Sequence, residues 1–472
     1  MRRLLVLLLT LLNGVALRGA EPSLRAGAYA MDVTPEKYPV SVNGGFADRK
    51  ANSAHDPLHA RCLVLDDGTT KLAIVVVDSC MIPRELIDEA KAIASKKTGI
   101  PVTNMLVSAT HTHSAPAVAG VFGSDPDAEY TKFLIRKIAE GIDKAHSLLA
   151  PAKVAWGVAE EPNQVFNRRW KMKASVKNLD PFGNETDKVK MNPPRMSMDL
   201  VEPAGPTDPR VTAMALRDAN DKPLALFANY SLHYVGDMPA LSADYFGVFA
   251  DSIAGKLKAG KGFVAMLSNG TSGDVNNINF KETAPKFQPG ERSRLVADAV
   301  ASAAVKALDK AEYTSRATLR CATSEIELGV RKPTADEVKR AETILGKAKG
   351  RELKGAEDTY ARETVLIAKY PDKVTVPLQA MVIDGRAIIA IPCETFAEIG
   401  LSLQKTTVFK TTCVVSLANG YFGYLPTPAQ HKFGGYETWR ARSSFLEVGA
   451  SDAIQTEARL LVADTIMPRK KK

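Results

Sequence analysis

The chain has 472 residues, 45% of them hydrophobic, and a formal net charge of +9. A chain of this length holds one large domain or two, and its apolar content excludes disorder as the starting expectation. Part of the positive charge lies in the first twenty residues and in the C-terminal PRKKK, and no basic stripe with interleaved aromatic residues occurs. The sequence therefore indicates no nucleic-acid partner.

The N-terminus predicts export. Residues 1–20 start with a basic segment, continue as an apolar run and end in small residues, which is typical of a signal peptide cleaved near Ala20. An uncleaved anchor is the alternative, although the run is short for a membrane span. The basic tail at 466–472 is either a solubilising end or a peripheral membrane contact. We expect an exported protein (periplasmic, secreted or extracytoplasmic), and the sequence does not predict its oligomeric state.

The first part of the chain alternates between apolar runs and amphipathic segments. A strand at 71–79, a helix at 83–99 and a strand at 104–110 follow one another, which indicates a parallel crossover. The full set expected before residue 170 comprises strands at 62–67, 71–79, 104–110 and 153–162 and helices at 83–99 and 127–150.

Residues 170–206 are polar, rich in Asn, Pro and Lys, and without a period. We therefore expect a long loop there, without regular structure and with a functional role. The elements expected after this loop are strands at 211–218, 223–231 and 262–268 and helices at 245–258 and 289–311.

The last third begins with a charged helical stretch at 333–369 that is broken by glycines, and we expect a helical insertion, a hairpin laid on the surface. Asp384-Gly385 lies between two apolar runs and predicts a β-hairpin. A further strand is expected within 411–426. The fold class that these elements predict is α/β, with a mixed β-sheet core flanked by helices, as a single large domain over residues 27–465.

The segment SATHTHSAP places two histidines one residue apart at the end of an expected strand. Side chains alternate along a strand, so His111 and His113 are expected on one side. His233, Glu394 and Tyr424 each follow another apolar strand, and in open α/β sheets ligands gather beyond the carboxyl ends of strands. Imidazole nitrogen and carboxylate oxygen are common zinc ligands. The alternative for the histidine segment alone is a pair of hydrogen-bonded surface residues.

Two aspartates near these strand ends have two interpretations each. Asp78 either contacts a metal-binding histidine or caps the following helix. Asp244 has the same alternatives, with capping favoured because it lies at the expected start of a helix.

Eight segments of the chain resemble the neutral ceramidases and occur in that family's order, from about residue 27 to residue 450. They read MDVTP, SAHDPLHARCLVLDD, SATHTHSAP, FNRRW, NYSLH, SNGTSGDVNN, PCETF and NGYFGYLPTPAQHKFGGYE. The resemblance implies the N-terminal catalytic domain of that family. With it comes the expectation of a secreted zinc-dependent hydrolase that cleaves an amide (N-acyl) bond.

The resemblance also implies roles for individual residues. The implied Zn2+ ligands are His111, His233, Glu394 and Tyr424. His113 is implied as a proton-transfer group beside the zinc. Arg168, in FNRR, matches an active-site arginine of the family, and Tyr436 is implied to face the developing oxyanion.

Asn276 departs from the family pattern. The family has Gly-Asp-Val-Ser-Pro-Asn where this chain has GDVNNI, so Asn276 replaces the serine. Asparagine cannot be a nucleophile but can donate and accept hydrogen bonds, and activation of water by zinc needs no serine. The implied substrate is a small-molecule or lipid N-acyl compound, with ceramide itself in question. The alternatives are a zinc hydrolase of the same fold acting on an ester or other non-ceramide substrate, and a non-catalytic binding relative.

Overall fold

A computed structural model describes residues 23–472 except 239–240, 348–352, 354, 468 and 470–472. The expected signal peptide therefore lies outside the described residues, as does most of the basic tail. Within that tail, Arg469 pairs with Asp464 and Glu457. In the described ranges, no helix is both long and apolar enough to cross a membrane.

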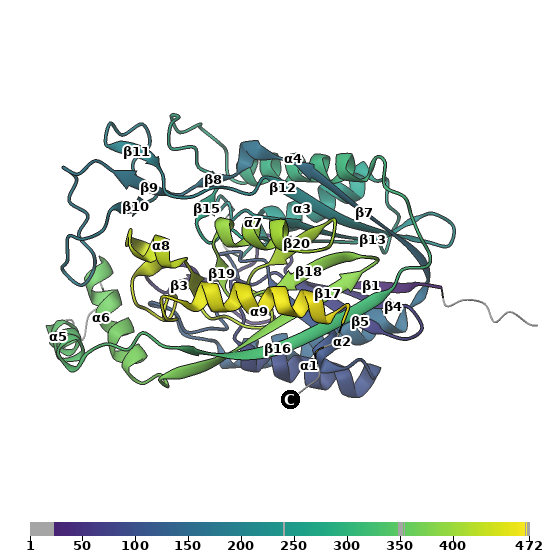
Figure 1. The fold of residues 1–472 in the computed structure, drawn as a ribbon, viewed down its shortest axis with the longest axis horizontal. Coiled ribbons are helices and arrows are strands. Elements are labelled where there is room, and N and C mark those ends of the chain that lie inside the picture. The colour runs from purple at the N-terminus through teal and green to yellow at the C-terminus, as the bar shows by residue number, and fades with distance from the viewer. Residues whose placement is uncertain (1–22, 239–240, 348–352, 354, 468, 470–472) are drawn as a thin grey trace, which may run out of the picture.

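An eight-stranded mixed sheet forms the first of two central layers (Figure 1), in the order β14-β13-β12-β7-β1-β4-β5-β6. Its strands are β1 (Arg25–Asp32), β4 (His59–Asp66), β5 (Lys71–Val77), β6 (Met105–Ala109), β7 (Ala150–Glu160), β12 (Arg210–Asp218), β13 (Pro223–Tyr230) and β14 (Val264–Asn269). β5 and β6 are parallel, which confirms the predicted crossover. β13 and β14 are also parallel, and the other pairs in this sheet are antiparallel.

Alternation along these strands gives the sheet two apolar faces. In β5, Val75 packs toward one core and Ile74 toward the other. The predicted helices cover the first face. They are α1 (Arg84–Thr98) and α2 (Ala128–Ser147) over one half of the sheet, and α3 (Asp244–Lys256) and α4 (Glu291–Leu308) over the other half.

A second sheet packs against the other face of the first. It has the order β16-β17-β18-β20 and comprises β16 (Leu319–Gly329), β17 (Lys373–Ile383), β18 (Arg386–Ala390) and β20 (Thr412–Val415). The turn from β17 to β18 has positive φ at both Asp384 and Gly385, as the hairpin prediction requires. The outer face of this sheet is covered by α7 (Ala397–Thr406) and α9 (Ala450–Asp464). The layers therefore run helix, sheet, sheet, helix, which confirms the predicted α/β class.

Short elements complete the described part of the chain. They are β2 (Val40–Val42), β3 (Arg49–Ala51), β8 (Phe166–Asn167), β15 (Val275–Asn276), β19 (Glu394–Thr395), β21 (Tyr424–Leu425), α8 (Pro428–His431) and 3-10 turns at Val102–Asn104, Pro162–Gln164 and Tyr436–Thr438.

The stretch 170–206 corrects one prediction, because it contains regular structure. It contributes to a small sheet of order β10-β9-β11, formed by β9 (Arg169–Met172), β10 (Val189–Met191) and β11 (Leu200–Pro203). Strands of three or four residues are too short to show a period in sequence. Their pairing joins segments up to about thirty residues apart and is visible only in three dimensions, at one end of the molecule (Figure 1).

The helical hairpin expected at 333–369 is present as α5 (Ala335–Lys347) and α6 (Gly355–Ala368). α5 is a surface helix whose buried position is Ala341. α6 is not a surface element, because Tyr360 and Glu363 are fully covered. Glu363 forms a buried ion pair with Arg442 at 2.7 Å, so this helix supports the loop that follows Tyr436.

Candidate metal centre

His111 and His113 reach one site from a loop rather than from a strand. β6 ends at Ala109, and His111 has a φ of 72°, in the left-handed region. The strand alternation expected for the pair is therefore wrong, because the chain has already left the extended conformation. Their rings still meet edge to face, with centroids 4.6 Å apart. A non-glycine residue with this φ is uncommon, and such residues cluster at functional sites.

Three donor atoms converge beyond the strand ends. His111 Nε2 lies 3.0 Å from His233 Nε2 and 3.2 Å from Glu394 Oε2, and His233 Nε2 lies 3.8 Å from the same oxygen. All three side chains are buried. They follow β6, β13 and β18, so strands of both large sheets end at one place. The structure thus brings together three residues that the sequence singled out as metal ligands.

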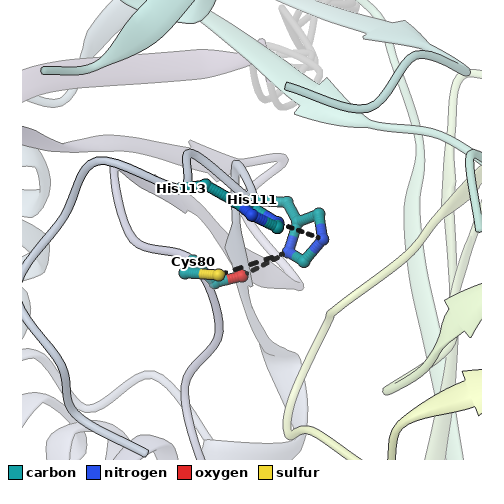
Figure 2. Close-up of side chains that lie close together, drawn as sticks. All are labelled: Cys80, His111 and His113. Carbon is teal, nitrogen blue, oxygen red and sulfur yellow. Dashed lines mark hydrogen bonds between the residues drawn. The ribbon is translucent and has the colours of Figure 1, made fainter. Parts of the chain in front are cut away.

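Backbone carbonyls determine which nitrogen of each ring carries the proton. His111 Nδ1 donates to the Cys80 carbonyl at 2.6 Å (Figure 2), and His233 Nδ1 donates to the Ser272 carbonyl at 3.0 Å. A carbonyl oxygen only accepts, so both Nε2 atoms are left without a proton and lie near Glu394 Oε2. Glu394 Oε2 is buried and has no hydrogen-bond partner of suitable geometry. These electron-rich atoms repel one another unless a positive charge lies between them, so the cluster fits a cation.

Burial and neighbouring charges act differently on the three imidazoles. Burial disfavours charge on His111, but the Glu394 carboxylate and the contact with Cys80 together outweigh it and raise the pKa of His111 to about 10. Burial and the Arg168 charge lower the pKa of His233 well below its ordinary value, and burial and the His111 charge do the same for His113. The cluster therefore accommodates one positive charge, either a proton on His111 or a metal ion. The other two imidazoles stay neutral, which is the form that ligates metals and accepts protons.

Tyr424 lies beside Glu394 because β19 and β21 pair in parallel, with these two residues as direct partners. Arg168 Nη2 donates to the Tyr424 hydroxyl at 3.0 Å, and Arg168 Nη1 lies 3.3 Å from His233 Nε2. Burial and the Glu394 charge raise the pKa of Tyr424 well above its ordinary value. A neutral phenol and a guanidinium therefore border the cluster.

His113 and Tyr436 also lie near the cluster. His113 Nε2 lies 3.1 Å from His111 Nε2, and its Nδ1 donates to the Gly44 carbonyl at 2.9 Å. The Tyr436 ring is 5.7 Å from the Tyr424 ring, centroid to centroid, and burial raises the pKa of Tyr436. These two of the predicted catalytic residues thus lie next to the predicted ligands.

Asn276 lies on β15, which pairs with β8 just before Arg168. Its Nδ2 donates to Asn192 Oδ1 at 2.8 Å, and its Oδ1 accepts from Ile278 N at 3.0 Å. Both ends of the amide are therefore engaged within the chain. The hydrogen bond to Asn192 joins the site to the segment 170–206.

Glu437 is a site residue that the sequence analysis missed. It is fully buried, and its two oxygens accept from Arg168 Nε at 2.9 Å and from Arg169 Nη1 at 2.5 Å. The only signal in the sequence is that it directly follows Tyr436. Without Glu437, two adjacent guanidinium groups would lie buried side by side.

The two aspartates with open interpretations are now placed. Asp78 pairs with buried Arg61 at 2.7 Å, so neither a contact to a metal-binding histidine nor a helix cap describes it. Asp244 accepts from Val235 N at 3.0 Å and from Gly236 N at 2.8 Å. It therefore holds the loop that follows His233. It is the first residue of α3 rather than its N-cap, and its Oδ1 also accepts from Tyr245 N at 2.6 Å.

The chain is similar in sequence to neutral ceramidases over about half of its length. No protein-family model matches the chain. It is 26% identical to neutral ceramidase B of Dictyostelium discoideum over 275 residues, and 23% identical to the neutral ceramidase of Pseudomonas aeruginosa over 280 residues. These stretches cover 54% and 56% of this chain, but only 36% and 38% of the lengths of those two proteins.

The structural likeness covers nearly the whole chain. The crystal structure of the Pseudomonas aeruginosa neutral ceramidase matches with a TM-score of 0.72 at 17% identity, over 96% of this chain and 76% of that chain. A ceramidase complexed with C2 matches with a TM-score of 0.70 at 16% identity, over 94% and 75%. The architecture is therefore the mixed α/β fold of the neutral ceramidases. Taken together with the sequence matches, the chain is a homologue of these proteins.

Proposed function

We propose that the protein is an exported, zinc-dependent hydrolase that cleaves the amide bond of a small-molecule or lipid N-acyl substrate. The observation that supports this best is the buried cluster of His111, His233 and Glu394, whose facing lone pairs and carboxylate call for a cation. Relatives named as ceramidases support the choice of an amide bond.

His111, His233 and Glu394 would hold the zinc, with Tyr424 as the fourth group. The donor set fits zinc, which binds imidazole nitrogen and carboxylate oxygen with tetrahedral geometry. When bound, zinc supplies Lewis-acid polarisation of the carbonyl and makes a water molecule acidic enough to ionise near neutral pH.

The other residues handle the proton and the negative charge. His113 has its Nδ1 engaged with Gly44, so its Nε2 is the nitrogen that takes a proton and returns it to the leaving amine. Arg168 and Tyr436 border the same space as hydrogen-bond donors for a tetrahedral oxyanion, where one donor contributes about 3 kcal/mol in comparable sites. Asn276 cannot attack, so the nucleophile in this proposal is water.

Metal analysis of the purified protein tests the ligand set. We expect about one zinc per chain, lost in His111→Ala and in His233→Ala. His146→Ala, a partly exposed histidine of α2, is the matched control and should keep its zinc. Full zinc occupancy in both site variants would contradict the assignment.

A substrate panel tests the reaction class. It contains ceramide, a short N-acyl amide and the matched ester. Zinc-dependent release of the amine from either amide is the expected result. Turnover restricted to the ester, or binding without turnover, would reject the amide hydrolase.

The processing of the chain is part of the same proposal. Residues 1–20 would be removed on export, and residues 27–465 would form the catalytic domain. The intact mass of the exported protein checks this, since a mature chain that starts after Ala20 has lost a defined mass. Retention of the leader would favour the uncleaved anchor.

A further inference from the structure

Tyr234 follows the predicted ligand His233 directly, and its ring lies flat on the imidazole of His113. The ring centroids are 3.7 Å apart and the planes differ by 13°. By contrast, the His113 ring meets His111 at 89° and His233 at 59°. Tyr234 therefore provides the face-to-face contact of this imidazole.

The backbone of the loop after His233 packs closely against the ring of Tyr234. Asp244 accepts hydrogen bonds from the backbone N–H groups of Val235 and Gly236. Gly236 has a φ of 79°, and a Cβ at this position would lie 2.5 Å from Tyr234 Cε2. Only glycine allows the loop to close in this way, so the placement of the tyrosine ring is built into the backbone.

His113 needs such a contact to keep a single orientation. Rotation about χ2 of histidine is broad rather than confined to sharp wells. The hydrogen bond from Nδ1 to Gly44 fixes one edge of the ring, and a Cβ on Gly44 would lie only 2.4 Å from it. The stacked tyrosine fixes the plane. Together they direct Nε2 toward His111, at 3.1 Å.

We propose that Tyr234 is a positioning residue that holds His113 in its proton-transfer orientation by stacking on it. The inference rests on the proposed acid–base role of His113 and adds a residue that the sequence analysis did not single out. The contact uses the face of the tyrosine ring. Phenylalanine at this position should therefore preserve the stacking, whereas an aliphatic side chain of similar size should lose it.

Steady-state kinetics with a short N-acyl amide test this. Tyr234→Leu should lower kcat by about 10-fold to 100-fold, as expected when a reacting group is misplaced by about 1 Å, with KM and zinc content unchanged. Tyr234→Phe should keep the kcat of the wild type. Tyr29→Leu, a partly exposed tyrosine on β1, is the control for loss of a ring elsewhere. An unchanged kcat in Tyr234→Leu, or equal losses in the Leu and Phe variants, would overturn the proposal.

NMR of protein labelled at histidine gives a readout that does not depend on turnover. The stacked ring should shift the His113 ring-proton signals upfield, assigned by their absence in His113→Ala. The shift should persist in Tyr234→Phe and disappear in Tyr234→Leu, and its persistence in Tyr234→Leu would overturn the stack. Full turnover by His113→Ala would instead reject the acid–base role of His113 in the proposed function. The tyrosine variants do not test that role, so the two failures can be told apart.

Discussion

Backbone carbonyls accept a hydrogen bond from Nδ1 of each of the three site histidines. Such bonds select the tautomer and orient the ring, as the partners of metal-binding histidines generally do. Here the partners are main-chain atoms, so the loop conformations themselves, including the left-handed His111, aim the Nε2 atoms at one another. At the scale of single residues, the positions of backbone carbonyl oxygens thus determine how the three imidazole rings are oriented.

His113→Ala should keep its zinc and lose turnover. A positioned general acid–base group contributes about 10²–10⁴-fold, and this is the loss in kcat expected for the variant. Metal content and kcat measured on the same preparation check the prediction. Loss of zinc in this variant would mean that His113 is a ligand and that the roles of the two histidines have been exchanged.

Glu437→Gln should destabilise the protein by about 3–5 kcal/mol, because a buried charge pair is broken and two guanidinium groups are left against a neutral amide. Urea unfolding measures the change. Glu202→Gln is the matched control: Glu202 is exposed and pairs with Lys171, so little change is expected. Equal urea midpoints for the two variants would show that the buried pairs of Glu437 contribute no more stability than the exposed pair of Glu202.

At the scale of elements, the segment 170–206 is tied to the site by its neighbours. Asn192 N donates to the Arg168 carbonyl at 2.9 Å, and Asn192 Oδ1 accepts from Asn276 on β15. The position at which the resemblance implies a serine therefore acts as an anchor for this segment. Its amide, longer than a serine hydroxyl, reaches across to Asn192 in this segment.

Asn276→Ser should release that anchor and favour ceramide over a short amide. The expected gain for ceramide is about one hydrogen bond, roughly 1 kcal/mol, so the ratio of kcat/KM values for the two substrates should shift roughly fivefold toward ceramide. The ratio is measured in both proteins with the same detergent. Efficient ceramide turnover by the unmodified protein would contradict the idea that Asn276 restricts the substrate.

At the scale of the whole molecule, the two sheets are joined by a buried polar chain as well as by their apolar faces. Lys91 of α1 donates to Asn419 Oδ1 at 2.7 Å, and Asn419 Nδ2 donates to Gln379 of β17 at 2.8 Å. Asn419 Oδ1 also accepts from Val107 N on β6 at 3.1 Å. These hydrogen bonds therefore link the helix layer and both sheets, through a residue of the loop that leads from β20 to Tyr424.

Lys91→Met should stabilise the protein at pH 7 by at most about 3 kcal/mol. Burial lowers the pKa of Lys91 to about 8, against 10.5 for an exposed lysine. Between these values the unfolded chain binds the proton and the native chain does not, so the stability of the wild type rises with pH across this window. The gain of the variant should therefore shrink from pH 8 to pH 10.5.

Thermal unfolding across that range measures the effect. Lys96→Met, an exposed lysine of the same helix, is the control and should show no such pH dependence. A variant of Lys91 that is less stable than the wild type at pH 7 would show that the Asn419 hydrogen bond outweighs the burial of the charge.

Local pattern in the sequence was enough to predict most of the elements and to single out residues that the structure brings together at the candidate site. The apolar runs of β5 and β6 and the helical spacing of α1 predicted the parallel crossover, because each signal depends on neighbours along the chain. His111, His233 and Glu394 were found in the same way, as polar groups directly after buried strands. Their roles as zinc ligands, and those of His113, Arg168 and Tyr436 in catalysis, stay predictions.

Tertiary structure alone decided how these groups face one another. The left-handed backbone of His111 results from hydrogen bonds to residues about thirty positions away, and the strands of the segment 170–206 exist only through pairing across the chain. Glu437 and Tyr234 could not be singled out beforehand, because a carboxylate between two arginines and a ring on an imidazole are contacts between distant segments. Burial and charge complementarity of this kind have no period along a sequence, so only the folded chain shows them.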